Sequence, residues 1–134
     1  MHAYFDAQDG NPKVVIGIGG TAKKPKKVVA ALFDTGHTGS LSLPTLDLIS
    51  IGAKLSSVSE VEYGNGYLGT VYYFSVKVII DGVEKMIEAG MIENPKATEA
   101  IAGLELFAPY IAIIDFKRQT VKFFTEEALK KTKF

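Results

Sequence analysis

The sequence predicts a mostly β protein whose sheet forms the wall of a barrel or a sandwich. Short runs of β-branched and aromatic residues alternate with Gly, Asn, Asp and Pro, as strands alternate with turns. The 134 residues fit one ordinary domain, residues 1–134, and no repeat, low-complexity tract or linker divides it. Hydrophobic residues make up 47% and charged residues 22%, so we expect a folded, soluble chain.

Several segments have the composition of strands. In chain order they are Ala3–Ala7, Lys13–Ile18, Lys27–Phe33, Ser59–Tyr63, Leu68–Ile80, Val83–Met91, Ile111–Phe116 and Thr120–Phe124. Turn-forming residues connect several neighbouring strands, at 9–12, 81–82 and 117–119. In the longest segment, Ser75 and Lys77 are two residues apart, which places both on one wetter face of the strand.

Helical patterns are few. Pro44 opens an apolar-periodic segment that we expect to form a short helix to Ile51, ending near Gly52. A second short helix is expected after Gly103. The tail 125–134 begins with a capping Thr, has acids in its first turn and lysines at its end, so it predicts a terminal helix.

Two local runs receive structural interpretations. Gly17-Ile18-Gly19-Gly20 does not complete a Gly-x-Gly-x-x-Gly phosphate-binding pattern, because position 22 is Ala, and we interpret it as a hairpin turn at a sheet edge. Lys23, Lys24, Lys26 and Lys27 flank Pro25 between two apolar runs, where we expect a solvated hairpin loop.

Charge and cysteine content limit the partners. Fifteen basic residues balance fifteen acidic ones, so no overall basic field favours nucleic acid. No cysteine is present, which excludes disulfides, thiol catalysis and cysteine-rich zinc sites. The N-terminal residues lack the pattern of a signal peptide, and no window reaches the roughly 20 apolar residues of a membrane span, so we expect a cytoplasmic protein that binds no membrane.

The candidate site is centred on Asp34-Thr35-Gly36. A strand of small and apolar residues, 28–33, delivers the Asp34 carboxylate to its end, and Gly36 allows a tight turn behind it. The tripeptide alone also fits an ordinary Asx turn at a strand end.

The wider segment Phe33–Pro44 resembles the active-site loop of the retropepsin-like aspartic proteases, especially their small bacterial and archaeal branch. The likeness covers the apolar run, Asp34-Thr35-Gly36, then Thr38-Gly39, and the apolar stretch that ends in Leu43-Pro44. This resemblance implies a closed β-barrel of one lobe that forms a homodimer.

Two other segments follow the order of this family. Residues 3–6 and 10–15 resemble its opening β-hairpin. Ile101-Ala102-Gly103 resembles its apolar-apolar-Gly element, which packs behind the catalytic loop, although Ala102 replaces a bulkier residue common in the family. The resemblance thus implies a supporting role for Thr38, Ile101, Ala102 and Gly103.

A hairpin is also expected at Val61–Leu68, where Gly64-Asn65-Gly66 supplies the positive φ that two-residue turns prefer. In the resembled family this position is the flap, which closes over an extended polypeptide and excludes water. The implied substrate contacts are Tyr63, Gly64, Asn65 and Gly66. An ordinary surface hairpin is the alternative.

Aspartic-protease chemistry needs two carboxylates that share one proton, because like charges a few Å apart cannot both be ionised. One carboxylate takes a proton from the attacking water while the other donates to the peptide carbonyl. This chain has one Asp-Thr-Gly, so the resemblance implies a homodimer that pairs two copies of Asp34 and hydrolyses polypeptide without a cofactor. It also implies that Thr35 joins the two loops and that Gly36 admits the substrate.

Other interpretations remain open. The same fold could serve as a peptide-binding or dimerisation module with little proteolysis, or the chain could be a monomer. The remaining aspartates, Asp6, Asp9, Asp47, Asp81 and Asp115, are interpreted as structural. His37 replaces a small or apolar residue of the resembled motif and either faces solvent or shifts the pH optimum. A metal site at His37, Asp34 and His2 is not expected, because no metal-binding spacing supports it.

Overall fold

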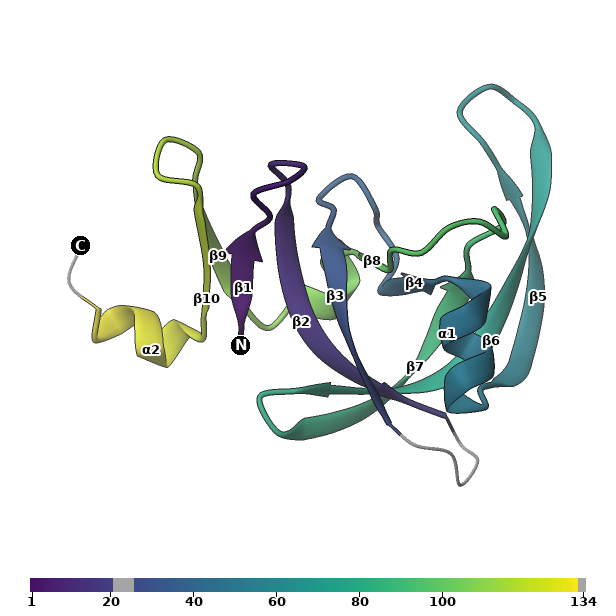
Figure 1. The fold of residues 1–134 in the computed structure, drawn as a ribbon, viewed down its shortest axis with the longest axis horizontal. Coiled ribbons are helices and arrows are strands. Elements are labelled where there is room, and N and C mark those ends of the chain that lie inside the picture. Colours follow the sequence, from purple (N-terminus) through teal and green to yellow (C-terminus); the bar gives the residue numbers. More distant parts are fainter. Residues whose placement is uncertain (21–25, 133–134) are drawn as a thin grey trace.

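The computed structural model describes residues 1–20 and 26–132. It is a mostly β protein with a closed six-strand mixed barrel and two short helices (Figure 1). The predicted barrel is therefore confirmed at this level. Lys23, Lys24 and Pro25 of the predicted lysine loop lie outside the described residues, as does the end of the predicted terminal helix.

Six strands close the barrel. In their order around it they are β2 (Pro12–Gly19), β3 (Lys27–Phe33), β8 (Ile101–Ala102), β4 (Leu41–Leu43), β7 (Val83–Met91) and β6 (Leu68–Ile80). Pairing of β2 with β6 completes the ring. The pairs β3–β8 and β4–β7 are parallel, and the other pairs are antiparallel.

Other strands extend the barrel or lie beside it. β1 (Ala3–Phe5) pairs with β2, and β5 (Lys54–Glu62) pairs with β6 and ends the sheet on that side. β9 (Ile111–Asp115) and β10 (Thr120–Phe124) form a separate hairpin. Both chain ends therefore lie on the same side of the barrel, away from β5 (Figure 1).

The helices begin and end where local chemistry predicts. Pro44 precedes α1 (Thr45–Ile51), and Gly52 ends it with a left-handed φ of 65°. A 3₁₀ helix, η1 (Leu104–Phe107), follows Gly103 as expected. The Thr125 side chain accepts a hydrogen bond from the Ala128 N–H and caps α2 (Glu126–Lys130).

The core fills the barrel from alternate positions of the strands. On β2, Val14, Ile16 and Ile18 are buried, as the period of two requires. Below the end of β3, the rings of Phe33, Phe107 and Phe123 pack with centroids about 5 Å apart, which joins the β9–β10 hairpin to the barrel.

One turn prediction is wrong. Gly17 and Gly19 lie within β2, in the segment that pairs with both β3 and β6. A Cβ on Gly17 would lie 3.2 Å from the Ile79 Cβ, so the missing side chain lets these two strands approach and close the barrel. Gly17–Gly19 is therefore part of the strand that closes the barrel, and it is not a turn at a sheet edge.

Three strand segments were absent from the prediction. β4 and β8 are too short to carry a pattern and depend on partners distant in the sequence. β5 begins at Lys54, before the predicted Ser59, because its first half is rich in serine and exposed. In the described part of the chain, no helix is long and apolar enough to cross a membrane.

Candidate functional site

The Asp34 loop, residues 34–40, connects β3 to β4 at one end of the barrel (Figure 1). The Asp34 N–H donates to the Ala102 carbonyl at 3.0 Å, which extends the pairing of β3 with β8 to the carboxylate-bearing residue. The Asp34 Oδ1 accepts from the Gly36 N–H at 2.9 Å, and the His37 N–H donates to the Asp34 carbonyl. Backbone bonds on both sides therefore fix the position of Asp34.

The segment 101–104 supports this loop from behind. The Gly103 N–H donates to the Ser40 carbonyl, and the Leu104 N–H donates to the His37 carbonyl, both at 2.9 Å. A Cβ on Gly103 would lie 2.1 Å from the Gly39 carbonyl oxygen, so only glycine fits between these backbones. Ala102 is fully buried. Ala102 and Gly103 thus contact the loop they were expected to support, whereas Ile101 pairs with Leu32 and Ser42 on either side of it.

His37 is half-buried within the loop, so the solvent-facing interpretation holds only in part. Its Nε2 lies 3.3 Å from the Ser42 Oγ, and its ring lies against the Cα atoms of Gly39 and Gly103. The two glycines provide the space for the imidazole. The sequence alone did not indicate this packing, because Ser42 and Gly103 come from other segments.

The rest of the loop faces outward. Thr35, Gly36 and Thr38 are exposed, and Asp34 is half-buried. Among the described residues no ion pair reaches the Asp34 carboxylate. The Asp34 loop of one chain therefore presents one accessible carboxylate, and its neighbour Thr35 is also exposed to another molecule.

The expected hairpin at 61–68 is confirmed, but its turn differs from the prediction. The last strand pair is Glu62 with Leu68, so the connection has five residues, 63–67, in place of two. The Tyr63 N–H donates to the Tyr67 carbonyl, and Asn65 Oδ1 accepts from the Tyr67 N–H. Gly66 alone of the Gly-Asn-Gly residues has a positive φ, of 82°.

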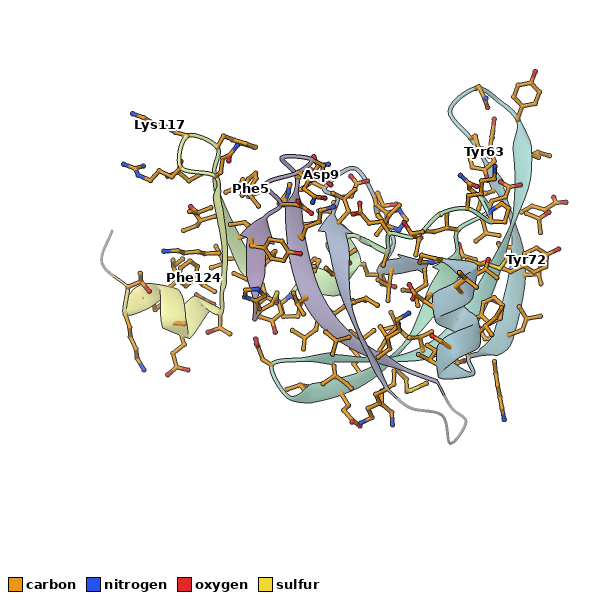
Figure 2. All side chains as sticks on the ribbon, viewed as in Figure 1. Phe5, Asp9, Tyr63, Tyr72, Lys117 and Phe124 are labelled. Carbon is orange, nitrogen blue, oxygen red and sulfur yellow. The ribbon has the colours of Figure 1, made fainter. Side chains whose placement is uncertain are left out.

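The hairpin formed by β5 and β6 and the Asp34 loop project from the same end of the barrel (Figure 1). Figure 2 shows Tyr63 near the root of the hairpin loop, well separated from the β1–β2 turn that carries Asp9. No hydrogen bond within the described chain joins residues 63–67 to residues 34–38. In the single chain the tip of this hairpin is therefore not hydrogen-bonded to the Asp34 loop.

A charged group that the sequence did not indicate lies beside the site. Lys13 of β2 is only 1% exposed, and its ammonium contacts the carboxylates of Asp9, at 2.8 Å, and Glu99. Burial acts to lower the pKa of Lys13, but its hydrogen bonds to Asp9 and Glu99 outweigh burial and raise that pKa. The hydrogen bond from Lys13 lowers the pKa of Asp9.

Within residues 1–20 and 26–132, no group of three or more His, Cys, Asp and Glu side chains is arranged to hold a metal. Comparison with protein-family models and with curated proteins found no match for this chain.

Proposed function

We propose that the chain is an aspartic endopeptidase that acts as a homodimer, with two copies of Asp34 as its catalytic carboxylates. The observation that carries this proposal is the setting of Asp34. It is a half-exposed carboxylate without an ion-pair partner in the described chain, fixed at a strand end by backbone bonds to Ala102 and Gly36. A fixed carboxylate loses little freedom in the transition state, which favours catalysis.

The chemistry requires the second carboxylate from a second copy. On a two-fold axis, each Asp34 loop would meet its equivalent, with the exposed Thr35 next to it. The two carboxylates would share one proton, so that one activates water and the other protonates the peptide carbonyl. The β5–β6 hairpin would close over an extended polypeptide as a flap, using Tyr63, Gly64, Asn65 and Gly66.

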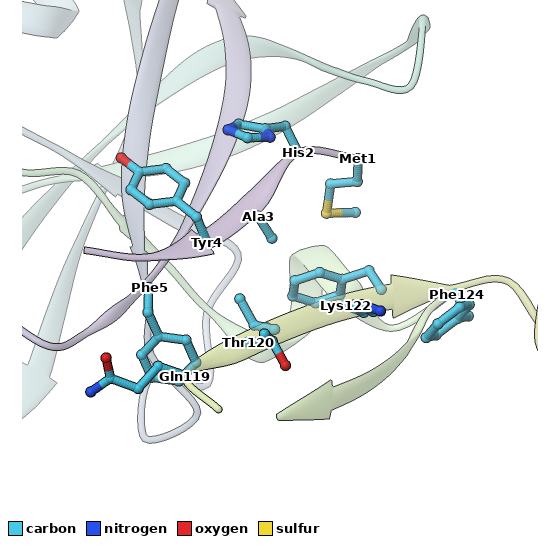
Figure 3. A pocket seen from close by; sticks show the side chains of 11 residues that line it. Met1, His2, Ala3, Tyr4, Phe5, Gln119, Thr120, Lys122 and Phe124 are labelled. Carbon is cyan, nitrogen blue, oxygen red and sulfur yellow. The ribbon is translucent and has the colours of Figure 1, made fainter. Parts of the chain in front are cut away.

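A groove of about 510 Å³ between the two chain ends provides a contact for the second copy (Figure 3). Residues 1–5 line one side and residues 119–124 line the other. β1 and β10 lie next to each other along this groove and line its two sides. A second copy that binds here would contact both strands at once.

The test is proteolysis by the purified protein and its Asp34→Asn variant, each incubated with denatured polypeptide from acid to neutral pH. We expect cleavage by the parent and a loss of about 10³-fold or more in Asp34→Asn, because the variant lacks the proton-transferring group. Sedimentation must show the same dimer for both proteins. Equal cleavage by the two proteins would refute the mechanism.

A peptide-binding module is the second candidate, and the outer edge of β5 favours it. β5 ends the sheet, and eight of its nine residues are exposed. An extended peptide could add to this edge as a further strand without being cleaved. Binding of denatured polypeptide that survives Asp34→Asn, with no cleavage by either protein, would support the module.

A further inference from the structure

We propose that the Lys13 cluster, formed by Lys13, Asp9 and Glu99, positions Asp34 by bridging the strand that carries it. This inference rests on the proposed function for its catalytic meaning, whereas the positioning itself is a property of the fold. Lys13 would act through backbone geometry and would not touch the substrate.

The cluster spans β3 from one side to the other. β3 lies between β2, which carries Lys13, and β8, which begins two residues after Glu99. The ion pair from Lys13 to Glu99 therefore crosses β3. Asp9, from the turn between β1 and β2, contacts the same ammonium, so three segments are joined at one buried charge.

The crossing occurs on the face from which Asp34 emerges. Lys13 pairs with Leu32, and Leu32 pairs with Ile101, so these side chains share one face of the sheet. Asp34 follows Leu32 by two residues, and its bond to Ala102 continues the same pairing. The period of two therefore places Asp34 on the face of Lys13.

The segment that Glu99 anchors is the one that holds Asp34. The Leu32 N–H donates to the Ala100 carbonyl at 2.8 Å, directly after Glu99, and the Asp34 N–H donates to the Ala102 carbonyl at 3.0 Å. If Lys13 released Glu99, the segment 99–102 could separate from β3, and both bonds would open more often.

In the Lys13 cluster one ammonium lies between two carboxylates, so replacing the lysine should disturb the contact between the segments that carry them. Lys13 is almost fully buried, whereas Asp9 and Glu99 are 41% and 43% exposed. Replacing Lys13 by an apolar side chain would leave two carboxylates facing each other, and their repulsion would push the two flanking segments apart. A neutral replacement of Glu99 would remove one bridge without creating this repulsion.

The direct experiment is backbone amide hydrogen exchange at Leu32 and Asp34 in Lys13→Met, Lys13→Arg and Glu99→Gln. We expect exchange at these two amides to be about tenfold faster in Lys13→Met and about threefold faster in Glu99→Gln, because local opening becomes more frequent. Lys13→Arg, which keeps a cation, should stay near the parent. The Ala53 amide, bonded to the Leu48 carbonyl at the end of α1, is the internal reference and should not change.

Lys26→Met is the matched control, because it removes the lysine of an exposed ion pair with Glu84 at the other end of the barrel. It should leave exchange at Leu32 and Asp34 unchanged. Unaltered exchange at these amides in both Lys13→Met and Glu99→Gln would overturn the proposal. So would equal acceleration at Ala53, since the cluster would then stabilise the whole fold without positioning Asp34. Glu99→Gln keeps the test available if Lys13→Met does not fold.

Proteolysis gives the second readout. In Lys13→Met we expect kcat to fall about tenfold with KM within about twofold, and Lys13→Arg to restore most of it, as for a misplaced catalytic group. Faster exchange with unchanged kcat would overturn the positioning role. If the parent protein cleaves nothing, the proposed function fails, while the exchange measurement still decides whether Lys13 holds Asp34 in place.

Discussion

Gly103 fits where no larger residue can, because the backbone of the Asp34 loop passes directly over its Cα. In Gly103→Ala the new Cβ would meet the Gly39 carbonyl oxygen at 2.1 Å and the His37 ring at 2.6 Å. We expect a loss of about 1–3 kcal/mol in unfolding free energy, from denaturant titration, since backbone must move to relieve this clash.

Gly64→Ala is the control for that measurement, because a Cβ there has nothing within 4 Å and Gly64 has no positive φ. It should change the unfolding free energy by no more than about 0.5 kcal/mol. Equal stability of the two variants would contradict the tight packing of residues 101–104 against the loop.

At the scale of elements, the turn between β1 and β2 should respond to acid. The hydrogen bond from Lys13 lowers the pKa of Asp9 below its ordinary value of 3.8, so the charged form stabilises the fold. That contribution is complete above about pH 4 and is lost as the pH falls through the lower folded-state pKa. Asp9→Asn removes the charge but keeps an oxygen for the Asn11 N–H.

The measurement is the difference in unfolding free energy between the parent and Asp9→Asn as a function of pH. We expect the parent to be the more stable protein near neutral pH and its advantage to shrink in strong acid. A difference that stays constant from about pH 2 to pH 7 would contradict the role assigned to the Asp9 carboxylate.

The elements that the sequence predicted well are those whose signals are local. The hairpin ending in β10, the helix after Pro44 and the capped helix after Thr125 carry their own turn or capping residues. The two-residue and three-residue strands β8 and β4 do not, because their stability comes from partners more than forty residues away. Gly17 was misread for the same reason, since its close neighbour is Ile79.

The site divides in the same way. Short sequence patterns predicted both Asp34–Gly36 and the supporting segment 101–103. The structure brings these two segments together. Lys13 and Glu99 are 86 residues apart, and a lysine within a strand is usually solvated. No local sequence pattern therefore predicted their contact. The number of copies needed to complete the site depends on contacts between chains, which the sequence pattern of one chain does not predict.

At the scale of the whole molecule, the proposed dimer should depend on the groove between β1 and β10. Thr120 is exposed and lines this groove, so Thr120→Arg would place a long cation where the second copy is proposed to bind. We expect the sedimentation equilibrium to shift toward monomer by about tenfold or more in dissociation constant, because the interface would have to bury an unpaired charge.

Activity should follow assembly in the same variant. Specific activity of Thr120→Arg should be low at dilute concentrations and should rise as the protein is concentrated, since each site needs two chains. Thr132→Arg, which adds the same charge after α2, is the control. Full activity of monomeric Thr120→Arg would disprove the shared site.

The late position of β8 in the chain has a consequence for protein synthesis. During translation, Asp34 leaves the ribosome about seventy residues before Ala102, whose carbonyl receives the Asp34 N–H. The barrel itself cannot close until β8, the last of its six strands along the chain, has emerged to pair with β3 and β4. A nascent chain therefore carries an Asp34 loop without its backing until Ala102 has emerged. If the chain is a protease, it cannot attack neighbouring nascent polypeptides before that point.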